Sequence, residues 1–153
     1  VPRRASALGP PTGLDPETLA GVVIDDRNAV KQGSWAEGTG LKGYVAYGYL
    51  YASAGSGASI RFEFKPPAAG RYEVRLAYQP HENRGTRVPV TVTSPEVTVA
   101  KQINMREPPP LDEGFISLGQ FDFRPEAPAA VEIGTKDAGG NAHADAVQFL
   151  PVK

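Results

Sequence analysis

Carboxylates and imidazoles are the side chains of this sequence that could perform acid–base chemistry or bind a metal ion. Two carboxylates are adjacent, at Asp25 and Asp26, and a third stands alone at Asp145. Neighbouring residues of a strand point to opposite faces, so Asp25 and Asp26 are not expected to serve one acid–base site together. We expect this pair to have a structural role, capping a turn after the first strand. The alternative is a structural calcium site built from one of the two carboxylates and backbone carbonyls.

Asp145 is expected to point into the interior, because it shares the two-residue alternation of Val147 and Phe149. An isolated carboxylate in an apolar interior is costly and requires partners. One candidate partner is the guanidinium of Arg84, which can match a carboxylate with two parallel hydrogen bonds. The other is the set of backbone amides in the Asp25–Asp26 turn. We therefore assign Asp145 a structural role, with ligand binding as the alternative.

The sequence lacks the residue patterns that mark common catalytic sites. Its two histidines are His81, in a polar loop, and His143, at the start of a strand, and neither has a catalytic signature around it. Residues 55–57 read Gly-Ser-Gly, which is not the spacing of a nucleophile elbow and indicates a hairpin loop. The absence of cysteine excludes thiol nucleophiles and cysteine-ligated metals. We expect that this domain is not an enzyme and that it needs no cofactor.

Charge and hydropathy argue against two classes of partner. The 16 basic and 17 acidic side chains are interspersed, so the chain offers no basic surface for nucleic acid. No apolar run approaches the roughly 20 residues of a membrane span. The 153 residues fit one ordinary domain. We expect residues 1–20, which are rich in proline and glycine, to be a linker or lead-in from a preceding domain with at most one helical turn, and residues 21–153 to form a single domain.

Apolar residues recur at every second position through most of the chain, which is the period of β-strands. Residues 115–123 change phase partway, which predicts a β-bulge near Gly119. Short strands separated by glycine and proline turns predict an antiparallel two-sheet β-sandwich of eight or nine strands. We expect these strands within residues 22–24, 45–51, 59–65, 71–78, 88–92, 97–99, 115–123, 129–133 and 143–150.

Four of the six tyrosines lie in the short segment 44–51. Tyr47, Tyr49 and Tyr51 share one face of the expected strand, and we expect this face to lie mostly inside the protein. Tyrosine has an apolar ring and a polar hydroxyl, so it can close the edge of a core or stack on a ligand. Tyr44 and the single tryptophan, Trp35, are our candidates for an exposed rim.

A series of short motifs resembles the golvesin and xanthan lyase C-terminal-like domain. This resemblance implies a jelly-roll-like β-sandwich, similar to carbohydrate-binding domains, that is attached to secreted polysaccharide-active enzymes or to predicted flavin-dependent oxidoreductases. It also implies accessory rather than catalytic work and an extracytoplasmic or secreted location, and it supplies no ligand residues. The motifs, in chain order, are Val23–Asp26, Gly33–Trp35, Gly48–Tyr51, Ala69–Val74, Asn83–Arg84 with Val88–Val92, Leu118–Phe123 and Ala144–Phe149.

Two functions remain open at this point. The first is a carbohydrate-binding module, because sugar rings stack on aromatic planes while their hydroxyls need fixed donors and acceptors. The second is a structural or interdomain module that positions a catalytic domain, such as a flavin-dependent oxidoreductase or a polysaccharide lyase, without binding sugar. The expected partner is therefore a polysaccharide or a neighbouring catalytic domain of the same chain. The candidate ligand-binding residues are Trp35, Tyr44, His81, Glu82, Asn83 and Arg84.

Overall fold

The computed structural model describes residues 12–153, and the chain there is almost entirely β-structure. It forms twelve strands in three sheets, and every pairing of neighbouring strands is antiparallel. The predicted all-β, antiparallel sandwich is confirmed, with more strands than the eight or nine expected. In sheet order the strands are β1 (Val22–Asp25), β12 (Ala146–Pro151), β6 (Gly70–Ala77) and β9 (Phe115–Phe123); β2 (Val30–Gln32), β5 (Ser59–Glu63), β10 (Ala130–Gly134), β7 (Val88–Thr93) and β8 (Thr98–Ile103); and β11 (Ala142–Ala144), β4 (Tyr49–Ala52) and β3 (Ala36–Gly38).

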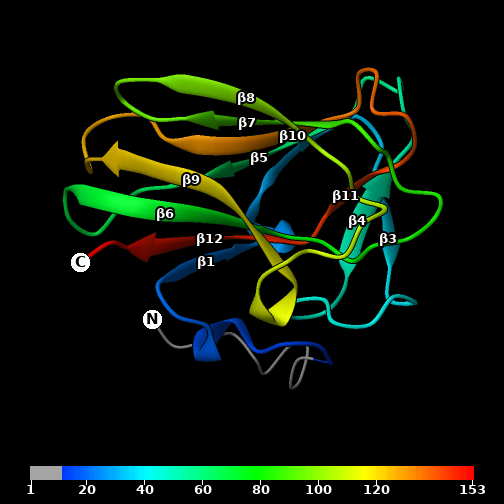
Figure 1. The fold of residues 1–153 in the computed structure, drawn as a ribbon, viewed down its shortest axis with the longest axis horizontal. Helices are drawn as coiled ribbons and strands as arrows, with labels where there is room; N and C mark the ends of the chain where they lie inside the picture. The colour runs from blue at the N-terminus through cyan, green and yellow to red at the C-terminus, as the bar shows by residue number, and fades with distance from the viewer. Residues whose placement is uncertain (1–11) are drawn as a thin grey trace.

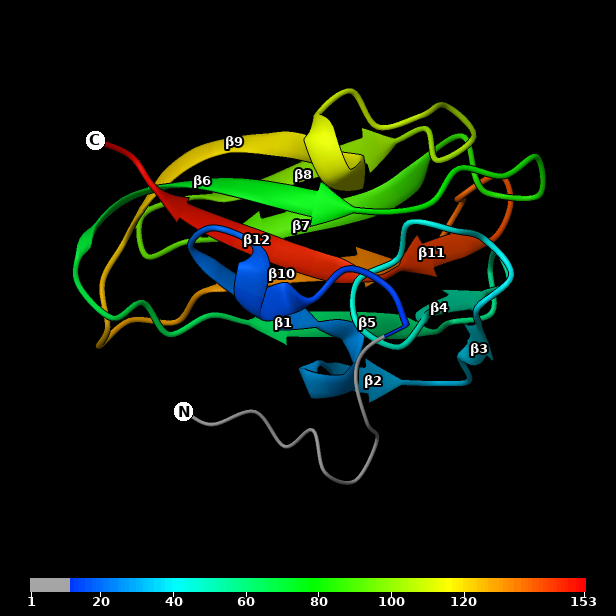
Figure 2. The same ribbon diagram turned by 90° about the horizontal axis from the view of Figure 1, so that it is seen from below.

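The four-stranded and five-stranded sheets face each other and enclose the main core (Figures 1 and 2). The alternation of the strands explains this arrangement, because Ile60 and Phe62 of β5 and Val147 and Phe149 of β12 all lie on inner faces and are fully buried. Phe149 also stacks on Phe64, with ring centroids 3.8 Å apart. The core therefore has the two-layer form that the pattern predicts.

The predicted bulge is present in β9. Val74 of β6 pairs with Gly119, but the next residue, Arg75, pairs with Ser117, which leaves Leu118 as the extra residue. Gly119 has a φ of 114°, a backbone conformation that residues with a side chain rarely adopt. The bulge turns Leu118 into the core and thereby reconciles the two hydrophobic phases of this strand.

The third sheet lies at one end of the sandwich and positions the candidate site (Figure 1). Its central strand, β4, begins only at Tyr49, because positive φ angles at Ala46 and Gly48 turn the chain before it. A side chain at Gly48 would place its Cβ atom 2.7 Å from the carbonyl oxygen of Gly38, so β3 and β4 can approach only with glycine there. The strand expected over residues 45–51 is consequently shorter.

Part of the expected lead-in is attached to the sandwich. The single helical turn allowed by the sequence is the 3₁₀ helix η2 (Pro16–Thr18), capped by the side chain of Asp15. Leu14 forms a bridge with Val45, and Leu19 is buried in a small second core with Phe115. Residues 1–11 of the lead-in lie outside the described residues. Within residues 12–153, no helix has the length and apolar character needed to cross a membrane.

The strand expected over residues 143–150 is interrupted at Asp145, which separates β11 of the third sheet from β12 of the four-stranded sheet. Asp145 therefore stands at the junction of two sheets, beside the end of β1. Two further 3₁₀ turns, η3 (Asp26–Asn28) and η4 (Asp112–Gly114), follow β1 and precede β9. The connection between β6 and β7, residues 78–87, runs past the third sheet and carries the polar loop.

Candidate functional site

A groove of about 420 Å³ lies between the third sheet and the β6–β7 connection. Tyr49 and Tyr51 enter it from β4, where alternation places both rings on one face. Three residues of the predicted polar loop form the facing wall, namely His81, Asn83 and Arg84. Aromatic rings and polar groups thus meet at one surface depression.

The polar loop is held in place by hydrogen bonds to its own backbone. The side chain of Arg106 donates to the Arg84 carbonyl oxygen at 2.7 Å, and the Asn141 amide donates to the Asn83 carbonyl oxygen at 2.9 Å. The Gly85 amide donates in turn to the Asn141 carbonyl oxygen at 2.8 Å. The groove wall is therefore fixed before any ligand arrives, which reduces the ordering cost of binding.

Arg84 forms a positively charged floor of the groove, and it is only 3% exposed. Its guanidinium carbon lies 5.0 Å from the ring centroid of Tyr51 and 5.7 Å from that of Tyr49, within cation–π range. Its Nη1 atom donates to Asn83 Oδ1 at 2.6 Å. Burial lowers the pKa of this guanidinium, which nevertheless stays charged. No carboxylate of the described residues forms an ion pair with Arg84, so its guanidinium contacts neutral partners and its charge is not neutralised by a counter-ion of the protein.

His143 lies directly beneath the groove and is fully buried. The Tyr49 ring stacks on it with a centroid separation of 4.5 Å. Nδ1 of His143 accepts a hydrogen bond from Arg84 Nε at 2.9 Å, so the neutral ring carries its proton on Nε2 and donates to Gln79 Oε1 at 2.7 Å. Burial, and then the charge of Arg84, lowers the pKa of His143 well below its usual value of 6.5. This histidine is therefore a neutral link between two polar side chains.

Gln79 extends the hydrogen-bonded chain to Asp145, whose Oδ2 atom accepts from Gln79 Nε2 at 2.9 Å. Both carboxylate oxygens of Asp145 also accept from the backbone amide of Val45, at 3.1 and 2.9 Å. The expected burial of Asp145 is confirmed, but neither expected partner binds its carboxylate. Arg84 is engaged by His143, and the Asp26 amide donates to the backbone carbonyl of Asp145 instead. Burial raises the pKa of Asp145 well above its ordinary value.

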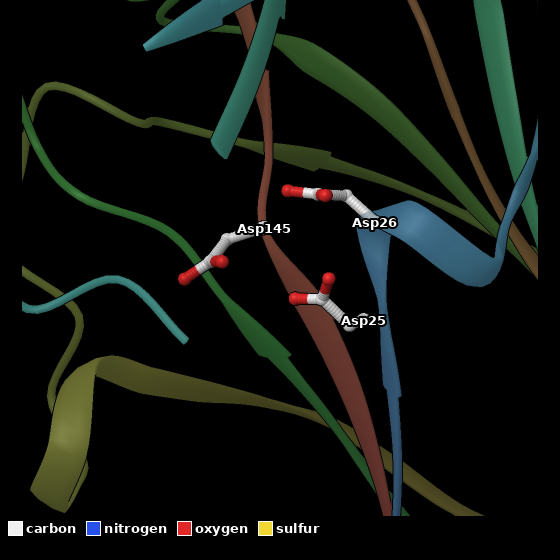
Figure 3. A group of neighbouring side chains, drawn as sticks. All are labelled: Asp25, Asp26 and Asp145. Carbon is white, nitrogen blue, oxygen red and sulfur yellow. The ribbon is translucent and has the colours of Figure 1, made fainter. Parts of the chain in front are cut away.

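Asp25 and Asp26 lie beside Asp145, and one oxygen from each of the three carboxylates lies within 4.8 Å of the others (Figure 3). The expected cap is confirmed for Asp25, whose Oδ2 atom accepts from the Arg27 amide at 3.2 Å at the start of η3; Asp26 is itself the first residue of that turn. The expectation that the two carboxylates would diverge is wrong. Strand β1 ends at Asp25, and the 3₁₀ turn that follows carries Asp26 to the same side as Asp25.

These two carboxyl groups share a buried environment that disfavours their charged forms. Burial raises the pKa of Asp25 to about 6. Burial, followed by repulsion from the charges of Asp25 and Asp145, raises the pKa of Asp26 to about 9. The end of β1 and the start of β12 therefore enclose a cluster of acidic groups. The nearby positive charges are too weak to keep these carboxyl groups ionised.

The remaining predicted residues lie away from the groove lining. Trp35 is half-buried against the core, and its indole Nε1 donates to the Ser59 carbonyl oxygen at 3.0 Å. The rim position expected for Tyr44 is wrong, because its ring is 8% exposed and its hydroxyl is hydrogen-bonded to Thr12 Oγ1. Glu82 is exposed on the polar loop but does not line the groove. Three of the six candidate ligand-binding residues, His81, Asn83 and Arg84, therefore line the groove.

The residues that sequence reasoning missed are Tyr49, Tyr51, Gln79 and His143. The strict alternation of Tyr49 and Tyr51 was a usable signal, since it places both on one face. No comparable signal exists for Gln79 and His143, because they stand in different strand regions that only the fold brings together.

The same fold occurs within two larger solved enzyme structures. The GH26-CBM35 β-(1,4)-mannanase of Podospora anserina matches with a TM-score of 0.60 and 15% identity over 86% of this chain and 28% of that chain. The exo-β-1,3-galactanase of Phanerochaete chrysosporium matches with a TM-score of 0.58 and 15% identity over 86% of this chain and 29% of that chain. At these identities, the likeness establishes the fold alone.

The chain belongs to the golvesin C-terminal domain family, whose model matches residues 22–151. It is 29% identical over 152 residues to a xanthan lyase of Bacillus sp. (strain GL1), covering 94% of this chain and 16% of that protein. The solved structure of a Paenibacillus xanthan lyase matches with a TM-score of 0.78 and 26% identity, over 86% of this chain and 13% of the other. The chain thus spans a small part of the length of these relatives.

Proposed function

We propose that this chain is a non-catalytic accessory module that binds carbohydrate in the groove formed by Tyr51, Arg84 and Asn83. The single observation that carries the proposal is the pairing of aromatic rings with a buried, positively charged guanidinium at this surface. A sugar ring can lay its apolar CH face on Tyr51 while its oxygen atoms meet Asn83 and His81. This arrangement binds a sugar without supplying an acid–base pair positioned to cleave it.

The charge of Arg84 favours an acidic sugar as the occupant. A guanidinium binds carboxylates with two parallel hydrogen bonds, and this one has no carboxylate partner among residues 12–153. The relationship to part of a xanthan lyase supports the same direction, with a polysaccharide bound here and acted on by a catalytic domain elsewhere in the parent chain. A secreted location follows from this proposal, because the polymer lies outside the cell.

The test is binding of the purified chain to xanthan, β-(1,4)-mannan and β-1,3-galactan, measured by affinity gel electrophoresis and calorimetry. We expect retention by xanthan that weakens with added salt, because a charge contact is screened. Tyr51→Ala should reduce the affinity at least tenfold. Tyr47→Ala is the matched control, since Tyr47 is a half-buried tyrosine of the same segment that lines a different cavity.

Two results would overturn the proposal. One is unchanged affinity of the Tyr51→Ala variant for a polysaccharide that the wild-type chain binds. The other is a failure of the wild-type chain to bind any of the three polymers and their oligosaccharides at millimolar concentrations. The second result would favour the structural alternative, in which the module only positions a neighbouring catalytic domain.

A further inference from the structure

The end of β1 brings three buried carboxyl groups together without an ion-pair partner among the described residues. Asp25 and Asp26 are each 5% exposed and Asp145 is fully buried, yet the three carboxylates converge within 4.8 Å. Arg27 and Lys31 are the nearby cations, but neither forms an ion pair with the cluster within the part of the chain that the structure describes. The Arg27 guanidinium lies over the Tyr47 ring instead, 5.2 Å from its centroid.

Two carboxylate oxygens in this cluster have no hydrogen-bond partner. Asp25 Oδ1 and Asp26 Oδ2 are both buried and unpaired, whereas Asp25 Oδ2 and both oxygens of Asp145 accept hydrogen bonds. Buried polar atoms are almost always satisfied, so an unpaired pair within one acidic cluster requires an explanation. Figure 3 shows that the side chains of Asp25 and Asp26 both extend toward the side on which Asp145 lies.

We propose that Asp25, Asp26 and Asp145 bind a divalent cation, and that this cation is calcium. The donors are all carboxylate oxygens, with no histidine or cysteine in the group, which is the ligand chemistry that calcium prefers. Calcium takes about six to eight oxygen ligands at about 2.3–2.6 Å, so oxygens on opposite sides of one ion are about 4.6–5.2 Å apart. The observed separations fit within that limit, and the coordination sphere is completed by backbone carbonyls and water.

The site also has a route from solvent. A cavity of about 300 Å³ reaches Asp26 and is lined by Glu37, Tyr47 and Gly48 as well. Asp26 is the member of the cluster that lines this cavity. Once bound, the ion would tie the end of β1 to the start of β12, the first and last strands of the sandwich. The proposed ion would thus stabilise the fold, and it can bind in the absence of a sugar.

The experiment is a calcium titration of the whole chain after dialysis against EDTA, followed by calorimetry and by thermal unfolding. We expect saturable heat with CaCl₂ and a melting temperature that rises with calcium concentration, whereas equal MgCl₂ gives a much smaller response. Terbium luminescence, excited through the tyrosines and displaced by calcium, provides an independent readout. None of these measurements requires polysaccharide, so failure here would be separate from failure of the proposed carbohydrate binding.

Asp26→Asn is the decisive variant, because the amide keeps the shape of the side chain and removes one charge. We expect it to weaken calcium binding at least tenfold and to reduce the rise in melting temperature that calcium produces, because an anionic ligand is lost. Glu37→Gln, an exposed acid lining the same cavity, should leave both properties unchanged. Absence of calcium heat and of a thermal shift in the wild type would overturn the proposal, as would equal losses in both variants.

Discussion

His143 is surrounded by groups that each restrict its protonation. Arg84 donates to Nδ1, the Tyr49 ring covers one face, and Gln79 accepts from Nε2. A proton added at Nδ1 would break the first of these contacts and bring two cations together in a buried place. These contacts explain how His143, which has no catalytic signature, can lie in the interior as a neutral ring that links Arg84 to Gln79.

This arrangement predicts a pH dependence of stability. The pKa of His143 is lowered in the folded state, so below the ordinary value of 6.5 the unfolded chain binds a proton that the folded chain excludes. The contribution of His143 to the free energy of unfolding should therefore fall as the pH drops below about 6.5, by up to about 1.4 kcal/mol per pH unit. The raised pKa values of Asp25, Asp26 and Asp145 act in the opposite direction, so the effect of His143 must be measured as a difference. Urea unfolding between pH 5 and 8 in EDTA, compared with His143→Asn, measures the effect as the difference between the two curves.

His81→Asn is the control for this prediction, because His81 lies on the polar loop rather than in the interior. Its curve should run parallel to that of the wild type. Nitrogen-detected NMR should also show a neutral His143 ring with its proton on Nε2 at pH 6. A His143 ring that titrates near 6.5 in the folded protein would contradict the interpretation.

At the scale of elements, the sequence predicts those strands that have one buried, apolar face and one exposed, polar face. It does not predict strands that lack this contrast. Strand β6 and the bulge in β9 could be derived from alternation alone. The short strands β2 and β3 could not, because they have no buried residue on either face to produce a pattern. Alternation also cannot show which elements lie side by side, so it does not reveal that the polar loop lies beside Tyr49 and Tyr51 and not beside Trp35 and Tyr44.

The pairing of β3 with β4 depends on Gly48. It has a φ of 149°, and a Cβ atom there would lie 2.7 Å from the Gly38 carbonyl oxygen. Gly48→Ala should lower the free energy of unfolding by about 1–3 kcal/mol. It should also weaken polysaccharide binding, because Gly38 and Tyr49 line the groove.

Gly55→Ala is the matched control for this prediction. The φ of Gly55 is also positive, at 70°, but no atom lies within 4 Å of an added Cβ atom there. We therefore expect only a conformational cost of about 1 kcal/mol. Equal losses of stability in urea would show that the close approach of the two strands is not limiting.

At the scale of the whole molecule, one hydrogen-bonded chain joins the groove to the acidic cluster. It runs from Arg84 through His143 and Gln79 to Asp145, and each step is between 2.7 and 2.9 Å. A cation that fixes Asp145 would therefore also fix the orientation of Gln79, and through His143 that of the guanidinium beneath Tyr51. The two proposed sites are separate in chemistry but share this polar connection.

The connection predicts that calcium and polysaccharide strengthen each other's binding. Energetic coupling between sites commonly amounts to about 5- to 150-fold in affinity, and it must be reciprocal. We expect calcium to raise the affinity for the bound polysaccharide at least fivefold in the wild type.

Gln79→Leu tests this connection, because it conserves approximate size but removes the amide that links His143 to Asp145. Calcium and sugar should each still bind to this variant, but calcium should no longer raise the affinity for the sugar. The variant should also be less stable by about 1–3 kcal/mol, because it leaves His143 Nε2 buried without an acceptor. Calorimetric titration of each ligand in the presence and absence of the other measures the coupling, and an enhancement of equal size in both proteins would show that it does not pass through Gln79.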